Sequence, residues 1–202
     1  MRHVEELSEH EMVATFLKAE VASTRFRKNI LALLHRDHRD RSVIDQPDTT
    51  NKKENAYRAR LLGKFRGYRQ NRNLFASFPR RIAWHRYALS KGELNKVKYI
   101  SDAYWYRLSS GSRLPGEAAK NVRAGQKIFG RSTRWHLDFA CALEGGAQFP
   151  ELILVGTGPD SQLVLLEGHG RLTAYSLVPT RTPKELSVII GFSRNMSRWV
   201  FF

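Results

Sequence analysis

Cysteine is almost absent from this 202-residue chain. The one cysteine, Cys141, has no partner for an internal disulfide. Chains without disulfides are typical of reducing compartments, so we expect a cytoplasmic protein. Cys141 lies in the apolar run 139–143, and this position predicts a buried thiol.

Long apolar runs are also missing. No stretch of about 18 apolar residues occurs, so no membrane-spanning helix and no membrane partner is expected. The first residues are acidic and polar, unlike a secretory signal. Hydrophobic residues still make up 42% of the chain, which is enough for the core of one large domain or two small ones.

Acidic residues are scarce relative to basic ones. The chain has 34 lysines and arginines against 19 aspartates and glutamates, a formal net charge of +15. Such an excess of positive charge gives information about binding partners rather than about the fold. Nucleic acid is the first partner to expect, and an acidic protein the second.

The positive charge is concentrated in residues 52–86. This stretch holds eleven lysines and arginines against one acidic residue, Glu54, which leaves a net +10. Leu61, Leu62, Phe65 and Tyr68 follow helical spacing and predict an amphipathic basic helix. The candidate nucleic-acid contacts are Arg58, Arg60, Lys64, Arg66, Arg69 and Arg72. A solvated basic face and a docking site for an acidic partner are equally open interpretations.

Helices are expected before this stretch. Ser8 and Glu11 form a capping-box pattern within a helix predicted over residues 1–22. A second helix is predicted over 25–35. The polar residues 42–55 predict a loop.

The most informative stretch is 163–175. Four apolar residues lead into Glu167-Gly168-His169-Gly170-Arg171, and a helix-compatible segment follows. This order predicts a strand, a glycine-rich turn and a helix start. The unpaired N–H groups of a first helical turn attract anions, and an arginine fork suits phosphate. A tight structural connection is the competing interpretation.

This turn resembles the second box of the ParB/sulfiredoxin superfamily, and is most similar to the Asp-Gly-His-His-Arg form of free serine kinases and many ParB-like domains. Here Glu167 replaces the aspartate and Gly170 the second histidine. The segment 110–125, with Ser112 and Arg113 in its loop, resembles the first box. The resemblance covers residues 97–192, in which 126–150 form an insertion.

The resemblance implies an α+β fold in which a helical basic region, 1–96, precedes a small ParB/sulfiredoxin-like mixed-sheet domain, 97–202. In that superfamily the two boxes form one nucleotide-phosphate pocket. The residues carried over to nucleotide binding are Ser112, Arg113, Gly168, Gly170 and Arg171. The resemblance makes Glu167 and His169 the catalytic candidates, with Glu167 also a ligand of Mg²⁺.

Several functions follow as alternatives. The first is binding of ATP or CTP, with magnesium-dependent NTP hydrolysis or phosphotransfer, although turnover itself is left open. The second is a DNA- or RNA-binding factor that uses residues 52–86 and whose ParB-like domain is not catalytic. The third is a ParB-like nuclease, for which the sequence offers no cluster of acids to hold two metals. Sulfiredoxin's own reaction is not expected, because the cysteine of that family's motif is replaced by His169-Gly170.

Overall fold

The computed structural model describes residues 1–202 as a mixed α+β fold, which confirms the predicted class. The helices are α1 (Glu9–Ala22), α2 (Arg27–Arg36), α3 (Ser42–Asp45), α4 (Lys52–Arg66), α5 (Lys91–Leu94), α6 (Ala103–Leu108), α7 (Pro115–Arg123), α8 (Trp135–Glu144) and α9 (His169–Leu177), with short 3₁₀ turns η1 (Asn73–Phe75) and η2 (Met196–Arg198). The strands are β1 (Arg2–Leu7), β2 (Ala83–Ser90), β3 (Lys127–Ile128), β4 (Arg131–Ser132), β5 (Leu152–Gly156), β6 (Val164–Glu167) and β7 (Glu185–Phe192).

A five-stranded sheet in the order β1-β2-β7-β5-β6 forms the centre of the molecule. Only β5 and β7 run parallel, while the other neighbours are antiparallel. The sheet therefore draws strands from both sides of residue 96, the boundary predicted between the helical region and the C-terminal domain. The small strands β3 and β4 form a separate hairpin.

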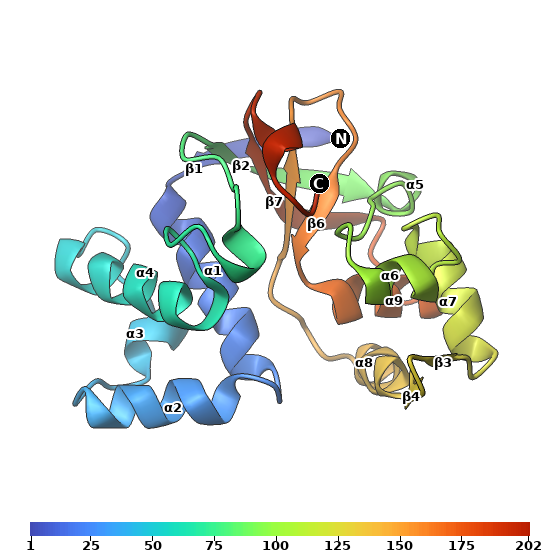
Figure 1. Cartoon of the computed structure of the whole chain (residues 1–202), viewed down its shortest axis with the longest axis horizontal. Helices are drawn as coiled ribbons and strands as arrows, with labels where there is room; N and C mark the ends of the chain where they lie inside the picture. Colours follow the sequence, from blue (N-terminus) through green and yellow to red (C-terminus); the bar gives the residue numbers. More distant parts are fainter.

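Helices cover both faces of this sheet. In Figure 1, α1–α4 lie on the left and α5–α9 on the right, with the sheet between them. Alternate residues of β5 serve the two sides: Ile153 packs into the core with α1–α4, whereas Leu154 packs into the core with α7–α9. Because helices cover both faces of the sheet here, β5 and β6 are continuous apolar runs rather than alternating ones.

The N-terminal segment differs from its prediction. The expected capping box forms, with the Ser8 side chain accepting from Glu11 N and the Glu11 side chain accepting from Ser8 N. The helix, however, begins only at Glu9. The prediction of a helix from residue 1 was wrong, because the residues before the cap pair with β2 as the edge strand β1.

The predicted loop 42–55 is also more structured than expected. It contains α3 and the first turn of α4, which Asn51 caps by accepting from Lys53 N and Glu54 N. None of the helices combines the length and apolar character needed to cross a membrane.

Cys141 lies on the solvent side of α8. The buried positions of this helix are His136, Ala140 and Leu143, which follow the helical repeat and exclude residue 141. The prediction of a buried thiol was wrong, because the apolar run extends around the helix beyond its buried face.

Candidate functional site

The 167–171 turn has the predicted backbone. Antiparallel β5 and β6 lead into Gly168, which has φ 109° and caps α9. L-residues rarely adopt this φ, so glycine is needed there. The first turn of α9 leaves backbone N–H groups without helical acceptors, as predicted from the sequence.

Arg171 is turned into the protein. Its guanidinium donates to the carbonyl of Pro150, to the carbonyl of Glu151 at 3.1 Å and to Glu167 Oε1 at 3.1 Å. Only 5% of the residue is exposed. A fork engaged in this way ties α9 to the segment before β5, and it offers little to a phosphate.

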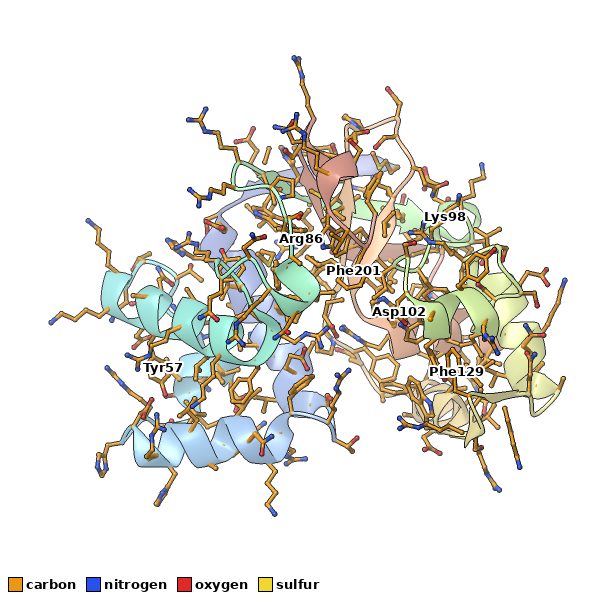
Figure 2. The ribbon with its side chains drawn as sticks, in the orientation of Figure 1. Tyr57, Arg86, Lys98, Asp102, Phe129 and Phe201 are labelled. Atoms are coloured by element: carbon orange, nitrogen blue, oxygen red, sulfur yellow. The ribbon has the colours of Figure 1, made fainter.

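Arg113, from the other predicted box, is likewise engaged. It donates to Tyr99 O at 2.8 Å and to the carbonyls of Phe202 at 3.1 Å and Phe201 at 3.5 Å. Phe201 lies near the centre of the view in Figure 2. The Ser112 hydroxyl donates to Ser109 O at 2.8 Å, within its own turn.

Tyr99 connects the two boxes. Its N–H donates to Arg113 O at 2.8 Å, and its hydroxyl hydrogen-bonds the Thr173 hydroxyl of α9 at 2.8 Å. The structure thus places Arg113 and Thr173 on either side of one buried ring. No motif marked Tyr99, because its role depends on contacts between segments distant in sequence.

His169 stands among aromatic rings. Its ring centroid is 4.7 Å from that of Trp105 and 5.9 Å from that of Tyr99. Its Nε2 is buried and has no hydrogen-bond partner. Burial, helped by the charges of Arg66 and Arg171, lowers the pKa of His169 to about 3, so the imidazole is neutral at pH 7.

Two glutamate–arginine pairs meet beside His169. Glu20 of α1 is 4% exposed and lies 3.1 Å from Arg66 Nε of α4, while Glu167 pairs with Arg171. Burial, and then the charge of Glu167, raises the pKa of Glu20 to about 8. Sequence reasoning missed Glu20, because a single acid in an amphipathic helix usually faces water.

Glu20 should make the stability depend on pH. The unfolded chain releases this proton near pH 4.5 and the folded protein only near 8, so the free energy of unfolding falls as pH rises between them. Burial lowers the pKa values of His169 and His136 to about 3, so below pH 6.5 the unfolded chain binds protons that the folded protein does not. The free energy of unfolding therefore falls as the pH drops below 6.5. We therefore expect the Tm to fall from pH 6.5 to 8 in the wild type, and a flatter profile in Glu20→Gln.

The control for this measurement is Glu6→Gln, which removes the same charge from an exposed position on β1. Differential scanning calorimetry at several pH values should give Glu6→Gln the slope of the wild type. An equal slope in Glu20→Gln would contradict the assignment to Glu20.

A magnesium site at Glu167 is not built by the surrounding residues. No three histidine, cysteine, aspartate or glutamate side chains converge anywhere in the chain. The Glu167 carboxylate is held by Arg171 instead. Glu167 as the ligand of Mg²⁺ stays a prediction.

The predicted basic helix forms as α4, but four of the six candidate nucleic-acid contacts in and just after it pair with carboxylates. Arg58 is 0% exposed, so it cannot contact nucleic acid, and its prediction as a contact was wrong. The ion pairs of the others are Arg60 with Asp37 at 3.5 Å, Arg66 with Glu20 at 3.1 Å and Arg69 with Glu9 at 2.6 Å. Lys64 and Arg72 are exposed, and neither pairs with a carboxylate.

Three further arginines without carboxylate partners line an open hollow of about 410 Å³. No hydrophobic residue lines it. The lining residues are Ser77, Pro79, Arg80, Arg81, Ser193, Asn195 and Arg198, and we call this feature the arginine hollow. None of its three arginines pairs with a carboxylate.

The sheet register creates this hollow. Ala83 at the start of β2 pairs with Phe192 at the end of β7, so the segments before β2 and after β7 lie side by side (Figure 1). The sequence placed Arg80 and Arg81 in the basic stretch but missed Arg198, because only the pairing of distant strands brings it there.

The walls of the arginine hollow rest on the core. Trp199 Nε1 donates to Leu74 O at 2.7 Å, and the rings of Phe78 and Trp199 meet edge to face at 5.3 Å. Ser193 N donates to Gly156 O at 3.1 Å. Both flanking segments are therefore fixed in place, which holds the backbone of the arginines in a defined arrangement.

No protein-family model, curated protein or solved structure matches this chain.

Proposed function

We propose that this protein binds nucleic acid through backbone phosphates held in the arginine hollow. The observation that carries the proposal is the convergence of Arg80, Arg81 and Arg198 on one polar hollow without a carboxylate among its lining residues. A net charge of +15 supports it, since a polyanion is drawn to such a protein over long range.

The arrangement favours phosphate for two reasons. Guanidinium groups form bidentate hydrogen bonds with phosphate oxygens, and Ser77, Ser193 and Asn195 supply further polar groups at the same place. In addition, the three arginines have no internal ion pair to break before they bind a ligand.

Removing the three charges should weaken binding strongly. We expect the triple variant Arg80→Ala, Arg81→Ala, Arg198→Ala to bind DNA and RNA at least about tenfold more weakly at moderate salt. The slope of log K against log salt should become less negative by about 3, because each phosphate contact contributes about one unit. Fluorescence anisotropy over a salt series measures both quantities.

A matched control removes three other exposed arginines. Arg2, Arg36 and Arg41 each pair with a carboxylate on the surface. Their triple alanine variant also removes three positive charges, so the two variants have the same net charge. It should keep most of the affinity and slope. Equal losses of affinity in the two triple variants would reject the arginine hollow as the binding site. Binding would then depend only on the net charge of the protein.

Nucleotide binding at the 167–171 turn is the second candidate. It is favoured by the buried Nε2 of His169, which has no partner, beside the first turn of α9. It requires Arg171 and Arg113 to leave their carbonyl partners. A thermal shift with ATP or CTP and Mg²⁺ that persists in the Arg80, Arg81, Arg198 variant would support this candidate.

A further inference from the structure

Phe129 occupies a position that its residue type does not suit. It and Gly130 form the two-residue turn between β3 and β4, with φ 49° and 73°. Turns with two positive φ values favour asparagine and glycine, and a bulky residue there is strained. The ring is also 55% exposed, so core packing does not offset this strain. Strained residues of this kind cluster at functional sites.

A second exposed ring belongs to the same structural unit. Trp135, 40% exposed, is the first residue of α8. The Thr133 hydroxyl donates to Gln126 O at 2.8 Å and ties the approach to α8 to the base of the β3–β4 hairpin. The indole stacks on His136, with centroids 3.6 Å apart and an angle of 29°.

The His136 ring packs against one face of the Trp135 indole. It is fully buried, and its Nε2 lies 3.2 Å from the Tyr104 hydroxyl of α6. The Trp105 ring approaches Trp135 edge to face at 6.4 Å. The exposed indole is therefore held in one orientation, and a partner that stacks on it need not order it first.

Four cations belong to the same part of the molecule as the two rings. The guanidinium carbon of Arg107 lies 4.7 Å from the centre of the Phe129 ring, and Figure 2 shows Phe129 between α6 and α8. Lys127, Arg131 and Arg134 are exposed on the hairpin and just after it. None of these four cations pairs with a carboxylate. Asp138 is the one acidic residue between positions 118 and 143.

We propose that this surface binds single-stranded nucleic acid, with bases stacked on Phe129 and Trp135 and phosphates held by Arg107, Lys127, Arg131 and Arg134. We call these six residues the stacking surface. Exposed aromatic rings among cations are the combination that recognises single strands without regard to sequence. A duplex cannot use the rings, because its bases already stack on one another. This inference rests on the proposed function in one respect, that the ligand is nucleic acid. The arginine hollow and the stacking surface share no residue.

Phe129→Asn is the sharpest test. Asparagine suits a positive φ, so the variant loses the ring while the hairpin keeps or gains stability. We expect Phe129→Asn and Trp135→Leu each to weaken binding of a labelled single strand of about 12 nucleotides by about tenfold. Binding of a duplex of the same sequence should not change. Val4→Thr, at an exposed apolar position on β1, serves as the control and should change neither.

The outcomes separate this inference from the proposed function. If Phe129→Asn weakens single-strand binding and the Arg80, Arg81, Arg198 variant weakens nothing, the stacking surface stands and the arginine hollow fails. If the triple variant weakens both forms and Phe129→Asn, with an unchanged Tm, weakens neither, the stacking surface fails and the arginine hollow stands. Equal losses for single strand and duplex in Phe129→Asn would also overturn the stacking surface. A wild type that binds neither form overturns both proposals.

Discussion

Replacing Arg58 with alanine should lower the free energy of unfolding by about 3–5 kcal/mol, the cost typical of removing one partner from a buried charged network. The Arg58 guanidinium donates to Val43 O at 2.9 Å and Asp48 O at 2.6 Å. It also donates to Asn55 Oδ1 at 2.5 Å and Glu54 Oε2 at 3.1 Å. One fully buried side chain thus joins α4 to α3 and to the segment between them.

Alanine would leave two buried acceptors, Val43 O and Asn55 Oδ1, without a donor, and each buried unsatisfied group costs about 1–3 kcal/mol. Arg58→Lys should recover only part of the loss, because an ammonium group cannot reach the same set of acceptors. Urea unfolding, followed by circular dichroism, measures the change.

Arg60→Ala provides the comparison, since Arg60 is exposed and pairs weakly with Asp37 at 3.5 Å. Its cost should be at most about 1 kcal/mol. A loss for Arg58→Ala no greater than that for Arg60→Ala would show that the buried network contributes little.

The second large effect is expected from Gly168→Ala, at about 2–5 kcal/mol. A Cβ at this position would lie 2.4 Å from Leu152 Cδ2 and 3.1 Å from Arg171 Nη2. The φ of 109° adds backbone strain of about 1–3 kcal/mol to the cost of overpacking. Thermal unfolding should show a correspondingly lower Tm.

Gly116→Ala is the matched substitution. Gly116 lies in α7, and a Cβ there meets nothing within 4 Å. Alanine should therefore be neutral or stabilise by up to about 1 kcal/mol. If both variants unfold at the same temperature, the close approach at Gly168 does not constrain the fold.

Local signals predicted much of this structure. The Ser8–Glu11 capping box, the strand that leads into the 167–171 turn and the helix that begins after Gly168 all form, because each depends on residues within a few positions of one another. The edge strand β1 could not be found in this way, since its partner β2 lies about 80 residues later and its own sequence is polar.

In the candidate sites, too, local features were predicted and long-range contacts were not. The residues of the 167–171 turn were placed on the correct elements, but the acceptors of Arg171 lie in the segment before β5 and carry no motif. Arg58 looked like one more surface cation, because its burial depends on how α3 packs against α4. The arginine hollow required the β2–β7 register, which no local pattern encodes.

The position of β7 in the sheet has a consequence for biosynthesis. β7 lies between β2 and β5, yet it is the last strand of the sheet to leave the ribosome. Until then β2 has no partner on one side, and β5 and β6 can form only a detached hairpin. The nascent chain therefore carries exposed strand edges from the synthesis of β2 until that of β7, a state in which chains aggregate and chaperones bind. Completion of the sheet is a late, long-range step, and such steps make folding slow.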